Sequence, residues 1–443
     1  MPNNLAEVHD LDYWLRYIST IHPREIELGL DRIRSVAENI GLQKPAPQVV
    51  VVAGTNGKGS CITTMETILL EAGYRVASYT SPHIQHFAER IKVNGIEANE
   101  SLLCSAFARV EAGREGISLS YFEFSTLAAL WIFCNAELDV VLLEVGLGGR
   151  LDAVNIVDGD VTVISSIALD HQDWLGDSLD LIGAEKAGIL RSNVPLVYGD
   201  RIPVVKIIQR ARQMHAPVYL LGDQFDWAEG ELDGSWNWRG YKHGYTDRQS
   251  ALPNIQLAKN NAALALQALF LLDLELPEAS IKTALQGLHC AGRQEHRIDV
   301  QTSTSVILDV AHNPAAMLAL ADHLQHERKQ NPKLSQISVV MAVMADKDIE
   351  GMVAALESWV DIWYIAQVEE PRCMPLEEAA GRLEQSGGTK RLFRQDSVAT
   401  AYGQACKTSV EFEAANPGKE SMVVVVGSFF TVAAVRELSK TAG

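Results

Sequence analysis

The sequence predicts an α/β protein of two domains, each built around a mostly parallel sheet. Its 443 residues are enough for two to three domains. Short β-branched runs alternate with longer apolar segments at helical spacing, which is typical of parallel sheets covered by helices. This alternation stops at a polar, glycine-containing stretch, Gly287–Arg297, and restarts beyond it. We therefore expect one domain over residues 1–290 and a second over residues 291–443.

The first strong strand leads into a loop with the composition of a phosphate-binding loop. The stretch Val49–Ser60 reads VVVVAGTNGKGS, and its glycines let the backbone turn sharply and bring N–H groups to an anion. Lys58 adds a positive charge, and Ser60 adds a hydroxyl that can ligate Mg²⁺. A helix expected over Cys61–Glu71 would place its positive end at the phosphates. The N-terminal domain is therefore predicted to be P-loop ATPase-like.

The loop differs from the common G-x-x-x-x-G-K-[ST] pattern. Val52 stands five residues before Gly57, and Gly59 separates Lys58 from Ser60. The alternative is a glycine-rich turn that binds nothing. The lysine, the serine, the strand and the helix all fall where a phosphate loop needs them, which favours the functional interpretation.

Polar side chains follow the next predicted strands at the points where those strands end. The strands are Arg75–Tyr79, Asp139–Val145 and Val161–Ile167. Ser81 follows the first as a second hydroxyl, although a serine there is often a helix cap. Glu144 ends the second and requires a cation partner, which would be a metal or a neighbouring arginine. His171 follows the third, and parallel sheets bind ligands at this carboxyl edge.

Lys186 lies in the otherwise apolar segment Leu181–Leu190. A buried lysine needs a partner or a modification, because burial disfavours its charged form. The alternative is a surface-facing turn on which Lys186 pairs with Glu185 or another carboxylate.

The remaining elements of the first domain serve mainly for packing. Tyr121, Phe122 and Phe124 form either a flat wall for a planar ligand or part of the core, and Arg90 either faces the site or lies on the surface. We expect helices over Leu11–Ile21, Arg24–Leu42, Ser120–Cys134 and Leu257–Leu272, strands over Val194–Tyr198 and Pro217–Leu221, and a small β-meander over Asp223–Tyr245.

The second domain is predicted to be doubly wound. Its expected strands are Ser305–Val310, Ile337–Val343, Asp361–Ala366 and Met422–Val426. Its expected helices are Pro314–His326, Ile349–Leu356, Pro375–Leu383, Val398–Cys406 and Phe430–Leu438.

Composition excludes several classes of partner. The formal net charge is −18, which argues against a nucleic acid or an anionic membrane as partner. The six cysteines include no C-x-x-C pair, so a cysteine-based zinc or dithiol site has no support, and scattered cysteines suit a reducing cytosol. The N-terminus MPNNLAEVHD is not a signal peptide, and no apolar run approaches the ~20 residues that span a bilayer. We expect a cytoplasmic protein.

Seven motifs together resemble one enzyme family over nearly the whole chain. They are VAGTNGKGS at 52–60, SPH at 81–83, EVGLGGRLDAVN at 144–155, LDH at 169–171, EKAGI at 185–189, GRQEHR at 292–297 and LDVAHNP at 308–314. In this order they resemble the folylpolyglutamate synthases, above all the bacterial bifunctional dihydrofolate synthase/folylpolyglutamate synthases of the Mur ligase superfamily. These are relatives of the amide ligases that build peptidoglycan precursors.

The resemblance implies ATP-dependent amide bond formation. A carboxylate of dihydropteroate or of a folate attacks the γ-phosphorus of ATP, and L-glutamate then attacks the acyl phosphate. It implies ATP and two Mg²⁺ as cofactors, with K⁺ as a further candidate ion, small-molecule substrates and a monomer. It also implies that the two domains close for catalysis. A monofunctional folylpolyglutamate synthase is the alternative.

The resemblance also assigns residues. The catalytic residues it implies are Lys58, Glu144, His171, Lys186 and His312, the last near the glutamate. The implied ATP contacts are Thr55, Asn56, Gly57, Lys58, Gly59, Ser60, Asn260, Arg293 and Asp309. The implied metal ligands are Ser60, Ser81 and Glu144 at one site and Glu144, His171 and a carbamylated Lys186 at the second. The implied pterin pocket comprises Phe122, Glu123, Leu151, Asp152 and Ala153. One departure is Val310, where many relatives have glycine.

Two further classes fit less well. A peptidoglycan-precursor ligase should carry an extra N-terminal domain, and only a short segment precedes Val49. A non-enzymatic nucleotide switch would need only the phosphate loop, and it would leave His171, Lys186 and the second domain unexplained.

Overall fold

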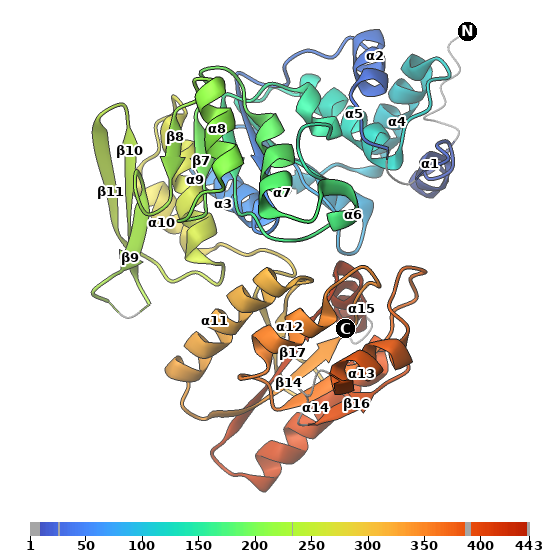
Figure 1. Ribbon diagram of the computed structural model, residues 1–443, viewed down its shortest axis with the longest axis vertical. Coiled ribbons are helices and arrows are strands. Elements are labelled where there is room, and N and C mark those ends of the chain that lie inside the picture. The colour runs from blue at the N-terminus through green and yellow to red at the C-terminus, as the bar shows by residue number, and fades with distance from the viewer. Residues whose placement is uncertain (1–8, 25–26, 233, 386–390, 441–443) are drawn as a thin grey trace. The chain divides into compact units, whose positions relative to one another are not determined.

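The chain forms two compact units, Met1–Leu288 and His289–Gly443. The computed structural model describes residues 9–24, 27–232, 234–385 and 391–440. Each unit contains its own sheet covered by helices (Figure 1). The α/β prediction is confirmed for both.

Unit 1 is built on an eight-stranded sheet of order β4-β3-β2-β5-β1-β6-β7-β8. The strands are β1 (Gln48–Ala53), β2 (Val76–Tyr79), β3 (Ile91–Val93), β4 (Ile96–Glu97), β5 (Val140–Glu144), β6 (Val161–Ile164), β7 (Leu196–Tyr198) and β8 (Val218–Leu220). The six strands from β2 to β8 in this order run parallel, and β3 and β4 extend the β2 edge in antiparallel pairing. The central strands are buried on both faces, which explains their continuous apolar runs.

Helices cover both faces of this sheet. They are α1 (Leu11–Ile18), α2 (Asp31–Asn39), α3 (Lys58–Glu71), α4 (Glu100–Arg114), α5 (Tyr121–Cys134), α6 (Gln172–Leu175), α7 (Leu179–Lys186), α8 (Val205–Gln213), α9 (Lys259–Leu271) and α10 (Glu278–Gln286). Side chains of β1 alternate between faces, so that Val49 and Val51 join the core under α4, α5 and α8. The alternate residues Val50 and Val52 point to the opposite face, where α3 packs against α9 and α10.

The β-meander prediction is confirmed by a separate antiparallel sheet of order β11-β10-β9. Its strands are β9 (Asp226–Glu229), β10 (Trp236–Lys242) and β11 (Tyr245–Leu252). The indole of Trp238 donates to the Ala263 carbonyl at 3.2 Å, which holds this sheet against α9.

Unit 2 contains a six-stranded sheet of order β12-β13-β17-β14-β15-β16. The strands are β12 (Glu295–Ile298), β13 (Ser305–Leu308), β14 (Leu334–Met341), β15 (Ile362–Ile365), β16 (Leu392–Arg394) and β17 (Glu420–Val426). The helices are α11 (Pro314–Gln330), α12 (Ile349–Leu356), α13 (Leu376–Gln385), α14 (Val398–Ala415) and α15 (Phe429–Lys440). Helices α11 to α13 share one core with the sheet, while α14 packs with α15 and β17. The unit is thus doubly wound, as predicted.

Several local predictions were wrong. The helix after the phosphate loop begins at Lys58 and not at Cys61, because Gly57 adopts φ 86° and caps it. The polar stretch expected as a plain boundary contains strand β12, which pairs antiparallel with β13. Helix α2 begins only at Asp31, and α14 continues to Ala415. Within the described ranges, no helix is both long and apolar enough to cross a membrane.

Candidate active site

The carboxyl ends of adjacent parallel strands bring three of the predicted residues of unit 1 together. Val52 of β1 pairs with Glu144 of β5, so the phosphate loop starts beside this carboxylate. Glu144 is 2 % exposed, and its Oε1 lies 4.0 Å from the Lys58 Nζ. The backbone N–H of Ser81, which follows β2, donates to Glu144 Oε2 at 3.1 Å. The buried carboxylate therefore has a cation and an N–H donor beside it.

Two glycines of the phosphate loop are required by close approaches. Gly54 has φ 150°, and a Cβ there would lie 1.9 Å from the Ser165 Oγ. Gly57 has φ 86°, and a Cβ there would lie 2.4 Å from the Asn261 Oδ1. A larger residue at either position would push the loop away from β6 or from α9.

Part of the loop backbone is already hydrogen-bonded to the segment that follows β6. The N–H of Thr55 donates to the Ser166 carbonyl at 2.8 Å, and that of Asn56 donates to the Ser166 Oγ at 3.1 Å. The first turn of α3, Lys58–Ser60, has no intrahelical acceptors for its N–H groups because it opens the helix. An anion at this loop would therefore meet the helix end and Lys58.

The two lysines of the site share one acceptor. Lys58 Nζ donates to the Gly54 carbonyl at 3.2 Å, and Lys186 Nζ donates to the same oxygen at 3.0 Å. Lys186 is 4 % exposed. Burial, followed by the charge of Lys58, lowers the pKa of Lys186 to about 7, against the opposing charges of Asp170 and Asp152. A neutral amine is therefore accessible at neutral pH.

The alternative position of Lys186 on a surface turn is wrong. Glu185, its expected partner there, pairs with Arg150 at 2.8 Å. The loop 146–150, called the GLGGR loop after its sequence, explains the arrangement. A Cβ at Gly149 would lie 2.9 Å and 3.0 Å from the carbonyl oxygens of Glu185 and Lys186. Close packing of this loop on α7 thus holds Lys186 toward the phosphate loop.

Two further carboxylates surround these lysines. Asp152 is buried and accepts from the N–H groups of Leu147 at 2.9 Å and Val154 at 3.0 Å. Burial raises its pKa to about 6, although these N–H groups and Lys58 act in the opposite direction. Asp170 is buried as well, and sequence reasoning passed over it in favour of the next residue.

His171, predicted at the same sheet edge, lies on the surface of unit 1. It is exposed and is the N-cap of the short helix α6, with φ 50°. Its backbone N–H donates to the Asp170 carboxylate at 2.9 Å. The LDH motif thus carries one buried acid whose charge acts on Lys186 and one exposed imidazole.

Aromatic rings lie beside the end of β5. A Cβ at Gly146 would lie 2.6 Å from the ring of Phe122, whose centroid is 5.9 Å from that of Tyr79. Phe124 belongs to the buried core. Arg90, which the sequence left open, is buried, and its guanidinium lies 5.5 Å from the ring centroid of Tyr121.

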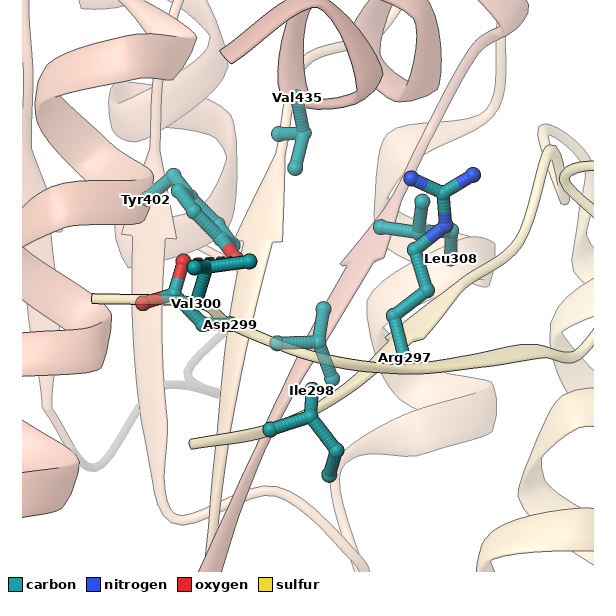
Figure 2. Close-up of a pocket in the computed structure, with 8 residues that line it drawn as sticks. Arg297, Ile298, Asp299, Val300, Leu308, Tyr402 and Val435 are labelled. Atoms are coloured by element: carbon teal, nitrogen blue, oxygen red, sulfur yellow. Dashed lines mark hydrogen bonds between the residues drawn. The ribbon is translucent and has the colours of Figure 1, made fainter. Parts of the chain in front are cut away.

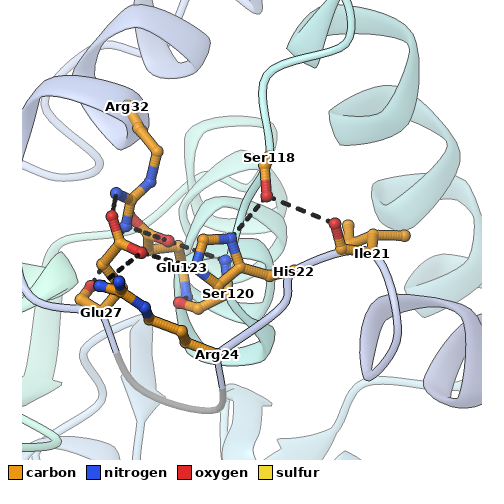
Figure 3. Close-up of polar contacts among 8 residues, drawn as sticks. All are labelled: Ile21, His22, Arg24, Glu27, Arg32, Ser118, Ser120 and Glu123. Atoms are coloured by element: carbon orange, nitrogen blue, oxygen red, sulfur yellow. Dashed lines mark hydrogen bonds and ion pairs between the residues drawn. The ribbon is translucent and has the colours of Figure 1, made fainter.

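Glu123, predicted in the pterin pocket, belongs to a polar network at the start of α5 (Figure 3). Its carboxylate accepts from the Ser120 N–H at 2.8 Å and from the Arg32 guanidinium at 3.1 Å. Arg32 also pairs with Glu27. Of the other predicted pocket residues, Ala153 is buried, while Leu151 is partly buried and accepts from the Gly29 N–H at 3.3 Å.

The first turn of α9 places its two asparagines in different surroundings. Asn260 is exposed and accepts from the Trp227 indole at 2.7 Å. Asn261 lies against Gly57, and its carbonyl accepts from the Cys61 thiol at 3.4 Å. Asn261 therefore supports the phosphate loop, a role that spacing alone did not distinguish.

Unit 2 places its three predicted residues near one another. Asp309 accepts from the N–H groups of Gln294 at 3.0 Å and Ala311 at 2.8 Å. Burial raises its pKa to about 6, and the charges of Arg293 and His312 act in the opposite direction.

His312 is held by Val310, the residue that stands where many relatives of the resembled family have glycine. His312 Nδ1 donates to the Val310 carbonyl at 2.8 Å, which fixes the tautomer. Val310 is not among the described residues with positive φ, so the position does not require glycine.

Unit 2 also contains a cavity of about 350 Å³ that includes none of the predicted residues (Figure 2). The Tyr402 hydroxyl on its wall donates to Asp299 at 2.9 Å, and Arg297 bonds to Glu295 at 2.6 Å. These polar groups of its wall are thus already hydrogen-bonded within the protein.

Comparisons with known proteins agree with this geometry. Residues 292–429 match the family model "Mur ligase, glutamate ligase domain". The chain is 43% identical to the dihydrofolate synthase/folylpolyglutamate synthase of Escherichia coli K12 over 96% of this chain and 94% of the relative. It is 36% identical to that of Haemophilus influenzae over 97% of each chain.

Solved structures show the same fold. The structure of E. coli FolC in complex with DHPP and ADP matches with a TM-score of 0.87 at 41% identity, covering 98% of each chain. The Yersinia pestis bifunctional enzyme complexed with AMPPNP and Mn ion matches with a TM-score of 0.86 at 40% identity, covering 97% of this chain and 98% of the other.

The fold and the phosphate-loop edge define a ligase of the Mur type. Within that class, the chain belongs to the dihydrofolate synthase/folylpolyglutamate synthase family.

Proposed function

We propose that this protein is an ATP-dependent ligase that joins L-glutamate to dihydropteroate and adds further glutamates to folates. The names of its relatives support both activities. The observation that carries the proposal is the convergence of Lys58, Lys186 and Glu144 at the end of β1. A non-enzymatic switch would need no second buried lysine beside the phosphate loop.

The chemistry requires activation of a carboxylate. A carboxylate oxygen of the substrate attacks the γ-phosphorus of ATP, ADP leaves, and the glutamate amine displaces phosphate from the acyl phosphate. Lys58 and the N-terminal turn of α3 bind the triphosphate and stabilise the charge that moves during transfer. Asn261 keeps the loop in place through its contact with Gly57.

Divalent cations would be held at the same edge. Solved relatives contain AMPPNP with Mn ion, and AMPPNP with Mn and L-glutamate. The Ser60 hydroxyl and the Glu144 carboxylate are hard oxygen ligands that suit Mg²⁺. We propose two Mg²⁺ sites, with Ser81 assisting at the first and His171 at the second, where the ions neutralise phosphate charge. K⁺ remains a candidate further ion.

Lys186 fits a metal site only when it is modified. An ammonium would repel the cation, whereas a carbamate formed with CO₂ presents two oxygens. Its burial and its neutral amine favour that reaction, which consumes CO₂ and releases one proton. We therefore propose that Lys186 is carbamylated.

The substrate residues divide between the units. Phe122 beside Gly146 and buried Asp152 would bind the pterin, with the aromatic ring stacking and the acid accepting from amino-pyrimidine donors. Arg293, Asp309 and His312 would contact nucleotide and glutamate from unit 2. We thus assign ATP and pterin binding to residues 1–290 and glutamate ligation to residues 291–443, and we expect the protein to be a cytoplasmic monomer.

A coupled assay tests the proposal. ADP release over many turnovers should require both glutamate and either dihydropteroate or a reduced folate, and Lys58→Ala and Glu144→Ala should each abolish both activities. Lys44→Ala is the matched control, because Lys44 pairs with Asp160 on an exposed part of unit 1. Continuous ADP release that needs neither dihydropteroate nor a folate would contradict the proposal, and activity with folates alone would favour a monofunctional folylpolyglutamate synthase.

A further inference from the structure

The half-buried cluster His296, His323 and Glu327 lies in unit 2 and belongs to none of the predicted sites. His296 lies on the edge strand β12, and the other two lie on α11. We propose that these three side chains bind one divalent transition-metal ion of the zinc class, a site additional to those of the ligase reaction.

Local structure directs the three side chains to one point. Residues four apart on a helix lie on the same face, so His323 and Glu327 project together from α11. Side chains alternate along β12, so Glu295 and Arg297 bond to each other on one face while His296 projects from the other. The rings of His296 and His323 meet edge to face with centroids 5.3 Å apart.

The distances fit a tetrahedral ion. The Nε2 atoms of His296 and His323 are 3.1 Å apart. Glu327 Oε1 lies 3.9 Å from the first nitrogen and 3.8 Å from the second. Ligands about 2.0–2.1 Å from a tetrahedral Zn²⁺ are about 3.3 Å apart, so small side-chain shifts would complete the set.

Hydrogen bonding alone accounts less well for the cluster. One proton between the two Nε2 atoms satisfies the histidines, but the carboxylate then faces both nitrogens at nearly equal distances that are too long for a hydrogen bond. A cation at the centre would contact all three groups. Two imidazoles and one carboxylate form a donor set typical of Zn²⁺, and less so of Mg²⁺.

The site would connect two elements of unit 2. Strand β12 is the edge of the sheet, and among the described residues of unit 2 it pairs with β13 alone. A bound ion would tie this edge strand to α11. The three side chains are about 13 to 26 % exposed, which leaves room for water as a fourth ligand.

Metal binding to the full-length, nucleotide-free protein tests the proposal. Bound Co²⁺ should give the visible absorption of a tetrahedral site. One equivalent of Zn²⁺ per protein should then displace the Co²⁺ and remove this absorption. His296→Gln and His323→Gln should each weaken this binding at least 100-fold, and Glu327→Gln at least tenfold. Zn²⁺ should also raise the melting temperature of the unchanged protein more than that of these variants.

His326→Gln is the matched control, because His326 lies on the same helix, is also half-buried and is outside the cluster. It should bind Co²⁺ like the unchanged protein. Unchanged Co²⁺ absorption in both His296→Gln and His323→Gln would overturn the proposal, as would the absence of a tetrahedral spectrum in the unchanged protein. Because the three ligands lie on two elements, the failure of one variant to fold leaves the other variants as tests.

Discussion

At the scale of single residues, Lys186 shows most directly how burial and neighbouring charges change the protonation of a side chain. It donates to the same carbonyl oxygen as Lys58, and it is buried beside two acids. Two cations at one oxygen are unfavourable, so the site favours either loss of the Lys186 proton or conversion of that amine into an anion.

We predict that Lys186→Ala loses most of both ligase activities and that acetate partly restores them, since acetate supplies the missing carboxylate. Protein equilibrated with ¹³CO₂ should show one carbamate carbon resonance that Lys186→Ala lacks. Lys206→Ala, at an exposed position of α8, should keep both the activity and the resonance. A resonance that persists in Lys186→Ala would refute carbamylation of Lys186.

The raised pKa of Asp152 predicts that this residue lowers the stability of the folded protein in a pH-dependent way. Its pKa is about 6 in the folded protein against 3.8 ordinarily. As pH rises from about 4 to about 6, the unfolded carboxyl ionises first, so this group lowers the free energy of unfolding over that window. The pKa difference corresponds to about 3 kcal/mol once pH exceeds 6.

The free energy of unfolding of Asp152→Asn, relative to that of the unchanged protein, should therefore rise by up to about 3 kcal/mol between pH 4 and pH 7.5, and the variant should lose pterin-dependent activity. At pH 4 both side chains are neutral in the folded proteins. Thermal unfolding at the two pH values measures the change. A difference in stability that is the same at pH 4 and at pH 7.5 would show that the folded site does not disfavour the charge.

At the scale of elements, close packing between loops and helices sets the position of the site residues. The GLGGR loop touches the carbonyls at the end of α7, and the phosphate loop touches α9. These approaches are possible only without a Cβ.

Gly149→Ala should destabilise unit 1 and reduce activity, because its Cβ would lie 2.9 Å and 3.0 Å from backbone oxygens that cannot rotate away. Gly403→Ala is the control on α14, where a Cβ would meet open space, and it should stabilise the protein by about 0.5–1 kcal/mol. Thermal unfolding and ADP release measure both variants. Normal activity and stability in Gly149→Ala would show that α7 can shift without moving Lys186.

At the scale of the whole molecule, each unit contributes residues to one proposed reaction. The residues of unit 1 suit phosphate and pterin binding, while those of unit 2 lie in the part that matches a glutamate ligase domain. One reaction sequence can then serve both substrates.

Asp309→Asn and His312→Ala should each lower ligation of glutamate to dihydropteroate and to folates in parallel, by at least tenfold. Asp322→Asn, an exposed change on α11, should leave both rates unchanged. Steady-state rates with each acceptor measure the ratio of the two activities. Loss of one activity with retention of the other would indicate separate sites.

The sequence by itself determined the strand, the loop and the helix of the phosphate site, the alternation that defines two α/β units, and the family. The phosphate loop could be predicted because its strand, glycines, lysine and helix are neighbours in the sequence, and the family could be recognised because its motifs occur in order along the chain. Glu144 and Ser81 followed from the rule that parallel strands end at one edge.

Only the tertiary structure decided which residues lie in contact across long separations. Lys186 reaches Gly54 over 132 positions, and Asn261 rather than Asn260 touches Gly57. Asp170 rather than His171 is the buried member of its motif, and His296 meets His323 from another element. The physical reason is that a shift of one residue along a helix or strand redirects a side chain by about 100° or 180°, and only packing fixes that choice.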